Sequence, residues 1–159
     1  MERSAVIDTS GMYRYSLGRR WAAGEVVTWI MLNPSTADGN TDDPTIRRCV
    51  GFSHDWGFGA MVVVNLYAYR ATSPWSLLEA HDPIGPEHHH YFLRALQCAS
   101  RVVVAWGAHE AATFRHVRPL LAYRPLLCLG TTKRGAPRHP LYVHSQVCPQ
   151  LWHIPGIGA

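Results

Sequence analysis

Four nearly continuous apolar runs are the clearest pattern in this chain of 159 residues. They occupy residues 26–32, 60–64, 101–106 and 126–129. Short apolar runs without polar alternation are typical of strands covered on both faces, as in a parallel sheet. Segments with helical signals separate the runs. The pattern therefore predicts an α/β fold, a three-layer α/β/α sandwich whose central sheet has four mostly parallel strands.

Helix-start signals lie between these strands. The pair Asp43-Pro44 predicts a helix that runs to about Trp56, because Asp caps free N–H groups and Pro suits the first helical position. Ser73-Pro74 repeats the signal. The further predicted helices lie at residues 75–79, 87–99, 108–121 and 145–151.

Two other segments carry structural expectations. Residues 12–17 alternate apolar and polar positions, which predicts an edge strand antiparallel to the first central strand, 26–32. Residues 88–90 are three consecutive histidines at a predicted helix start. Successive helical residues point about 100° apart, so the three cannot grip one metal ion there. We interpret them as a solvated helix start.

The strand ends carry the candidate chemistry. Asn33-Pro34-Ser35 follows the first central strand, Asn65 the second, Gly107 the third, and Gly130 with the basic loop 131–139 the fourth. The carboxyl ends of parallel strands share one edge of a sheet, where open α/β folds bind their ligands. We expect these segments to converge on one crevice.

Composition narrows the class of protein. Hydrophobic residues make up 47% and charged residues 16%, which is typical of one globular domain, here residues 1–159. The formal charge of +4 permits a polyanionic partner without requiring one. No apolar run approaches membrane-spanning length, and no signal-peptide core is present, so a cytoplasmic protein is expected. The four cysteines lie far apart without a C-x-x-C pair, which favours free thiols and predicts no metal and no cofactor.

Several motifs in order resemble a known family. They are WIMLNPSTAD, DDPTIRRC, WGFG, VVNLYAYRAT, DPIGP, AWGAH and GAPRHPLY. Over roughly residues 13–151 the chain resembles a bacterial domain-of-unknown-function family, number 1643 in that series. That family in turn resembles the uracil-DNA glycosylase superfamily.

The second resemblance rests on short patches. Leu32-Asn33-Pro34-Ser35 resembles the first glycosylase motif, with Asn33 where the most active enzymes carry Asp. Phe52 resembles the aromatic that stacks on a flipped base, and Asn65 the residue that reads the uracil edge. Residues 103–109 resemble the third strand with its Trp-Gly turn. His139-Pro140 resembles the start of the last motif, where Leu141 replaces the expected Ser.

The resemblance implies a glycosylase-like sheet and a DNA glycosylase that hydrolyses the N-glycosidic bond of a deaminated or modified, flipped base. DNA or a nucleotide would be the partner. The candidate catalytic residues are Asn33, His139 and Asp38. The candidate base-binding residues are Pro34, Ser35, Phe52, Asn65 and Tyr67. The candidate phosphate-binding residues are Arg47, Arg48, Arg70, Lys133, Arg134 and Arg138.

Structural alternatives stand beside these roles. Asn33-Pro34-Ser35 also suits a turn that ends a strand. Asp42 and Asp43 are, with Asp38, the carboxylates near enough to act as a general base, but a helix cap is a sufficient explanation for Asp42-Asp43. Phe52 also suits a core position, and Arg47-Arg48 a solvated helix face. Two other functions remain open: a non-catalytic binder of nucleic acid or nucleotide with the same fold, and a hydrolase of a free nucleoside or small metabolite.

Overall fold

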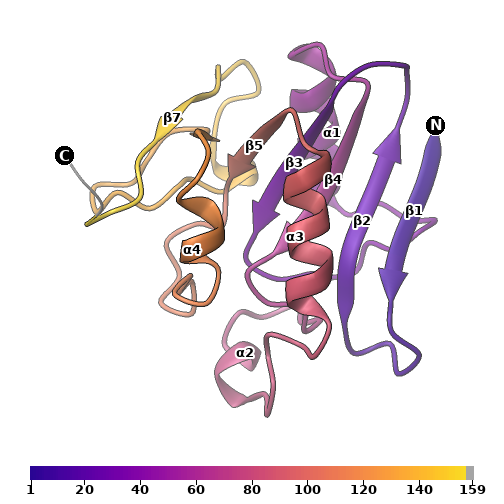
Figure 1. Ribbon diagram of the computed structural model, residues 1–159, viewed down its shortest axis with the longest axis vertical. Coiled ribbons are helices and arrows are strands. Elements are labelled where there is room, and N and C mark those ends of the chain that lie inside the picture. The colour runs from indigo at the N-terminus through magenta and orange to yellow at the C-terminus, as the bar shows by residue number, and fades with distance from the viewer. Residues whose placement is uncertain (157–159) are drawn as a thin grey trace.

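The computed structural model of the protein describes residues 1–156. It has an α/β fold with a seven-stranded mixed sheet in the order β1-β2-β4-β3-β5-β6-β7 (Figure 1). The strands are β1 (Glu2–Ile7), β2 (Arg14–Arg20), β3 (Val26–Met31), β4 (Ala60–Asn65), β5 (Arg101–Val104), β6 (Leu126–Cys128) and β7 (Gln150–Trp152). The outermost strands β1 and β7 lie at opposite ends of the sheet.

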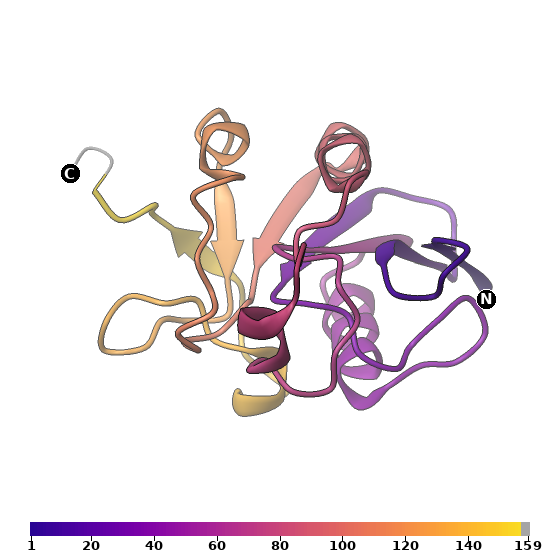
Figure 2. The same ribbon diagram turned by 90° about the horizontal axis from the view of Figure 1, so that it is seen from below.

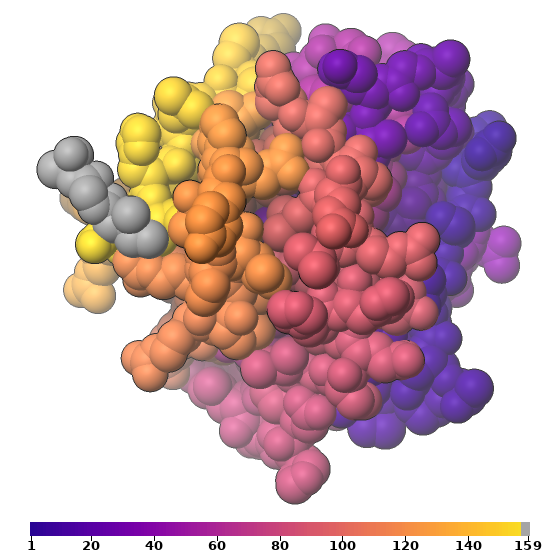
Figure 3. Space-filling model, in the orientation of Figure 1, coloured from indigo at the N-terminus to yellow at the C-terminus, as the bar shows by residue number. Residues whose placement is uncertain are grey.

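Helices cover both faces of this sheet. They are α1 (Pro44–Asp55), α2 (Ser76–Glu79), α3 (His88–Cys98), α4 (Arg118–Leu121) and the 3-10 helix η1 (Pro140–Tyr142). In Figure 2, α3 and α4 lie on one side of the sheet, and α1 and η1 on the other. The side chains of α3 and α4 close over their face (Figure 3). None of the helices described has the length and apolar content needed to cross a membrane.

The central strands run parallel. β3 pairs in parallel with β4 and β5, and β5 pairs in parallel with β6. β2 is antiparallel to β4, β1 to β2, and β7 to β6. Because β3, β4 and β5 end on the same side, their following segments meet at one edge, which faces the viewer in Figure 2.

Consecutive residues of β3 attach helices to opposite faces. The Thr28 hydroxyl donates to the carbonyl oxygen of Ala95 in α3 at 2.8 Å. The next residue, Trp29, donates its indole N–H to the hydroxyl of Ser53 in α1 at 2.9 Å. All three polar side chains are fully buried, and each bond satisfies a group that water cannot reach. These two bonds fix α1 and α3 relative to the strand that leads into the candidate site.

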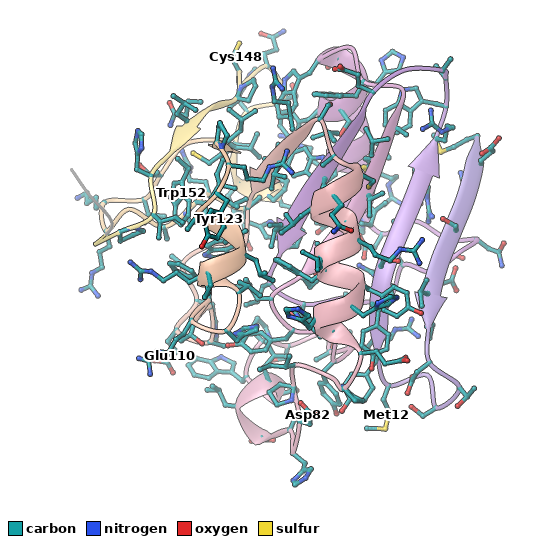
Figure 4. The ribbon with its side chains drawn as sticks, viewed as in Figure 1. Met12, Asp82, Glu110, Tyr123, Cys148 and Trp152 are labelled. Carbon is teal, nitrogen blue, oxygen red and sulfur yellow. The ribbon has the colours of Figure 1, made fainter. Side chains whose placement is uncertain are left out.

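A third anchor lies at the far end of the sheet. Trp152 of β7, labelled in Figure 4, has its ring centroid 5.3 Å from that of Trp106 and 5.9 Å from that of Phe114. Both ring pairs meet edge to face, which is a favoured aromatic geometry. The cluster holds the segment after β5 in place and brings β7 against β6.

The sheet differs from the sequence-based expectation. It has seven strands, because β1 and β7, which the sequence pattern did not predict, add to the four central strands and the strand expected at residues 12–17. The strand at residues 14–20 is not at the edge and does not pair with β3. It lies between β1 and β4 and pairs with both. A parallel β3–β4 pair leaves β4 with a free side, and that side accepts β2.

Two predicted helices were also wrong. Within 108–121, only Arg118–Leu121 is helical. The main-chain N–H of Ala111 is bonded to Nδ1 of His109 at 3.0 Å, so it is not available for a helical bond. The predicted helix 145–151 is absent, and residues 150–152 form β7 instead. Pro149 lacks the N–H that a helix interior needs.

Candidate functional site

A pocket of about 680 Å³ opens at the carboxyl edge of the parallel strands. Segments that follow four strands reach it: Asn33 after β3, Asn65 at the end of β4, Gly107 after β5 and Thr132 after β6. The start of β2 and the N-terminus of α1 complete the wall. The volume is in the range of ordinary small-molecule sites. Among the predicted site residues, the pocket is lined by Asn33, Ser35, Asn65, Arg138 and His139.

Asn65 is the least satisfied polar residue of the wall. Its side chain is 2% exposed, and neither amide Oδ1 nor Nδ2 has a hydrogen-bond partner. A buried polar group without a partner costs about 1–3 kcal/mol. The amide presents one acceptor and two donor hydrogens to the pocket. Such a group is set for a ligand that offers the complementary donor and acceptor.

Two histidines that do not line the pocket hold the backbone of this segment. Nε2 of His88 donates to the carbonyl oxygen of Asn65 at 2.6 Å, and Nε2 of His116 donates to that of Leu66 at 2.6 Å. His88 is 6% exposed and stacks on Phe92. Burial lowers the pKa of His88. The interpretation of His88 as solvated was therefore wrong, since its side chain is part of the core that positions Asn65.

The Nδ2 group of the Asn33 amide is already hydrogen-bonded within the protein. Nδ2 donates to the carbonyl oxygens of Pro34 at 3.1 Å and Ala71 at 2.9 Å. Its Oδ1 is the atom left for a ligand or a water. Pro34 itself is buried and outside the lining, and its carbonyl also accepts the N–H of Ala71 at 3.0 Å. The segment is at once a strand-ending turn and a wall of the pocket.

Two imidazoles lie on the β5–β6 side of the pocket. Nδ1 of His139 accepts the N–H of Leu141 at 3.2 Å, and Nδ1 of His109 accepts that of Ala111 at 3.0 Å. In the neutral ring the proton must then be on Nε2, which makes each Nε2 a donor. Nε2 of His109 is buried without a partner. Burial lowers the pKa of His139, so its neutral form is favoured at pH 7.

Asp43 is the one acidic residue that lines the pocket among the residues described. Its Oδ1 accepts the N–H of Ile46 at 2.9 Å and caps α1, as the sequence predicted. Asp38 does not line the pocket. Oδ1 of Asp38 accepts the N–H groups of Asn40 and Thr41, both at 2.8 Å, and these bonds lower its pKa. Asp38 therefore forms a turn, and Asp43 is the carboxylate in reach of a ligand.

The two aromatic candidates lie in the core. Phe52 is 2% exposed and packs against Trp29 and Trp56. Tyr67 is 8% exposed, and its hydroxyl lies 2.7 Å from Oγ1 of Thr113. Neither ring lines the pocket, so neither is placed to stack on a ligand there. The apolar face of a helix buries Phe52, and the structural alternative is the one observed.

Arg48 attaches one helix to another and does not face the pocket. Its guanidinium donates to the carbonyl oxygens of Pro140, at 3.2 Å, and Val143, and it lies over the ring of Phe52. These bonds attach η1 to α1, and η1 follows directly after His139. Arg48 is half-buried and does not line the pocket. It therefore positions His139 and η1, and it is not placed to bind a phosphate there.

The other cationic candidates divide by position. Arg138 lines the pocket and donates to the carbonyl oxygen of Tyr142 at 2.8 Å. Arg70 is half-buried and donates to the carbonyl oxygens of Ser35 and Gly11, each at 3.4 Å. Exposed cationic side chains outside the lining are Arg47, Lys133 and Arg134. Only Arg138 of this group has direct access to the pocket.

Two lining residues had no predicted site role: Arg14 was part of a predicted strand, and His109 appeared only inside a motif. Arg14 is 2% exposed and lines the pocket. An Arg inside the alternating segment 12–17 was a possible signal, because a charged residue in a strand is rarely buried without reason. Among residues 1–156, no group of three or more His, Cys, Asp or Glu side chains is placed to hold a metal ion.

Comparison with known proteins supplies a family. The family model described as "Protein of unknown function (DUF1643)" matches residues 14–141. The chain belongs to this family. No curated protein and no solved structure matches the chain. The DUF1643 segment begins at Arg14 and ends at Leu141, so it contains every lining residue of the pocket except Tyr142.

Proposed function

We propose that the pocket binds a nucleobase and that the protein is a DNA glycosylase of uracil-DNA glycosylase-like fold. The reaction is hydrolysis of the N-glycosidic bond of a deaminated or modified base that has left the DNA stack. Supporting observations are the placement of Asn65, the imidazoles of His109 and His139, and the presence of the Asp43 carboxylate and the Asn33 amide on the same pocket wall. Each of these sets of side chains has one task in the proposed reaction.

The unpartnered amide of Asn65 carries the proposal. Uracil and related bases present an N–H beside a carbonyl oxygen on one edge, and one Asn side chain complements both. Both amide atoms of Asn65 are buried at the pocket and lack protein partners. A base edge that paired with them would remove the cost of two unsatisfied groups. A base without the N–H and carbonyl pair would leave one of them unpaired, which gives selectivity.

His139 and His109 serve the leaving group. When the bond between C1′ of the sugar and the base nitrogen breaks, its electron pair remains on the base as negative charge. A neutral imidazole N–H aimed at a base oxygen stabilises that charge without first losing a proton. The Nδ1 contacts of both rings direct the proton to Nε2. His139 lies in the segment that Arg48 fixes, and His109 packs 4.5 Å from the ring of Trp75.

Asn33 and Asp43 serve the water. Oδ1 of Asn33 accepts one hydrogen of the water, which attacks C1′. The carboxylate of Asp43 stabilises the positive charge that develops on the sugar and takes the proton that the water releases. An amide cannot take that proton at neutral pH, so the two residues divide orientation and proton acceptance between them. Asp38 has no part in this arrangement.

The rim of the pocket suits DNA. Leu141 is 44% exposed and Tyr142 75% exposed at the pocket mouth, and Trp75 is 56% exposed beside His109. An exposed apolar side chain at this position fills the gap left in the duplex by a flipped nucleotide. Arg138, with the exposed Lys133 and Arg134 of the same loop, supplies phosphate contacts.

Binding without hydrolysis is the second candidate. It is favoured by one observation, namely that Asn33 uses Nδ2 for two main-chain carbonyls and Asp43 uses Oδ1 for the helix cap. Because these atoms are already hydrogen-bonded within the protein, such a site can recognise a base but activates water weakly. The two candidates share the Asn65 contact and differ in turnover.

A release assay separates them. Oligonucleotides that carry uracil, mismatched uracil, mismatched thymine, hypoxanthine or an oxidised pyrimidine are incubated with the protein, and abasic sites are cleaved with alkali and counted. We expect release of at least one base, its loss in Asn65→Ala, and undiminished release in Asn40→Ala, an exposed control. If no base is released from any substrate but the same oligonucleotides bind in a salt-dependent way, the protein binds nucleic acid without hydrolysing it. Release from free nucleosides alone would contradict the DNA substrate.

A further inference from the structure

Arg14 is a buried cation on the wall of the pocket. It is the first residue of β2, is 2% exposed and lines the pocket. Nη1 donates to the carbonyl oxygen of Ala37 at 3.0 Å, and Nε is buried without a partner. This is the one hydrogen bond that its side chain makes within residues 1–156. A guanidinium has five N–H donors, so most of its capacity is unused.

Arg19, in the same strand, shows that the fold can satisfy a buried guanidinium from within. Nε of Arg19 donates to Oδ1 of Asp42 at 2.8 Å, and Nη2 forms a salt bridge with the same oxygen at 2.8 Å. Its remaining donors reach main-chain carbonyls, among them that of Asp38 at 2.6 Å. Arg14 has no such carboxylate. The difference between the two arginines marks Arg14 as open toward the pocket.

The charge of Arg14 persists at neutral pH. Burial lowers its pKa to about 10, which still leaves the guanidinium protonated. Asp43 raises the pKa in part, but no salt bridge joins Asp43 to Arg14 among the residues described. A buried charge without a paired counter-charge is costly. A ligand that brings an anion to this wall removes the cost.

We propose that Arg14 binds an oxyanion of the ligand beside the base edge that Asn65 reads. The inference rests on the proposed function and adds a substrate class: a nucleobase ligand that carries a carboxylate or a phosphate. β2 and β4 pair directly, so Arg14 and Asn65 lie on neighbouring strands. His109 and His139 follow β5 and β6, beyond β3. A planar guanidinium suits either oxyanion, because it pairs with two oxygens at once.

Calorimetric titrations with matched pairs of probes test the inference. Uracil is compared with uracil-6-carboxylate, and uridine with uridine 5′-monophosphate, so each pair differs by one anionic group. The proteins are wild type, Arg14→Gln and Arg14→Lys. Arg47→Gln is the control, since it removes the same charge from an exposed position outside the lining. Far-UV circular dichroism and urea unfolding check that each variant folds.

We expect the anionic member of one pair to bind wild type on the order of tenfold more tightly than the neutral member. Arg14→Gln should abolish the gain, Arg14→Lys should keep part of it, and Arg47→Gln should keep all of it. A gain in the first pair identifies a carboxylate on the base, and a gain in the second identifies a phosphate.

Equal binding of both members of both pairs by wild type overturns the inference without reference to any variant. So does a gain that survives Arg14→Gln. Failure of the proposed function has a different signature: uracil and uridine do not bind, Asn65→Ala changes nothing, and inorganic phosphate still raises the melting temperature of wild type but not of Arg14→Gln.

Discussion

Nε2 of His88 lies 2.6 Å from the carbonyl oxygen of Asn65, the residue whose side-chain amide stands unpartnered on the pocket wall. The same strand end is therefore held firmly through its backbone and left open through its side chain. His88 is on α3, which covers one face of the sheet, and the Thr28–Ala95 bond fixes that helix to β3. A rigid backbone and an open amide are together what a recognition residue needs.

Replacing His88 by Phe should loosen this support. The ring and its packing on Phe92 are kept, while the donor to the carbonyl of Asn65 is lost. We expect the free energy of unfolding to fall by about 1–3 kcal/mol, since a buried carbonyl loses its partner. Base affinity should fall as well. Urea unfolding and calorimetry measure both. His89→Phe on the exposed face is the control, and an equal loss there would contradict the role of His88.

Stability should depend on pH through the buried histidines. Burial lowers the pKa of His88 and of His139 in the folded state below the ordinary value of 6.5. Below about pH 6.5 the unfolded chain therefore binds more protons than the folded one, and the free energy of unfolding falls as pH falls. The decline ends once pH is below the folded pKa values. Urea midpoints from pH 8 to 5 should show it.

His88→Phe provides the matched test of that pH dependence. With one buried titrating group removed, the decline in stability below about pH 6.5 should be smaller than in wild type. His89→Phe, on the exposed face of α3, should leave the slope unchanged. A slope that is identical in all three proteins would assign the pH dependence to other groups.

The parallel strands and α1 were predictable because their signals are local. A continuous apolar run needs two covered faces, and Asp43-Pro44 sets a helix start without help from distant residues. The convergence of strand ends followed from parallel direction alone. Asn33, Asn65 and His139 were found in this way, and all three line the pocket.

The remaining site residues depended on long-range packing. Arg14 reaches the pocket because β2 pairs with β4. The sequence of residues 12–17 does not indicate with which strand this segment pairs. The stacking role of Phe52 came from the resemblance alone, whereas its place on a helix also suited the core position that is observed. The sequence pattern of α1 does not say that Arg48 turns toward η1. β7 was missed because three residues carry almost no pattern, and its pairing with β6 decides its form.

Arg48→Gln should loosen the segment that follows His139, and it should not remove a contact with a DNA phosphate. The substitution removes the bonds to the carbonyls of Pro140 and Val143, so the segment after His139 loses its attachment to α1. We expect a loss of about 1–3 kcal/mol in stability and a fall in base release. The dependence of DNA affinity on salt should not change, since no phosphate contact is lost. A smaller salt slope in Arg48→Gln would restore the phosphate-binding role. Arg47→Gln is the matched control for stability.

Asn33→Asp tests whether Asp, which the resemblance places at this position in the most active glycosylases, would speed the proposed base release. Nδ2 of Asn33 donates to the carbonyl oxygens of Pro34 and Ala71, and an ionised carboxylate has no hydrogen to donate to either. The repulsion should raise the pKa of the new Asp and destabilise the protein by about 1–3 kcal/mol at pH 7. A raised folded pKa means that stability is lost as pH rises, so the deficit relative to wild type should shrink on acidification. Urea unfolding at pH 7 and pH 5 measures the deficit, and Asn40→Asp is the exposed control.

Base release should not increase, because the carboxylate would turn away from the two carbonyls and lose the orientation that Asn33 has. Faster release with unchanged stability would show that the turn tolerates a carboxylate and that Asn33 limits the reaction.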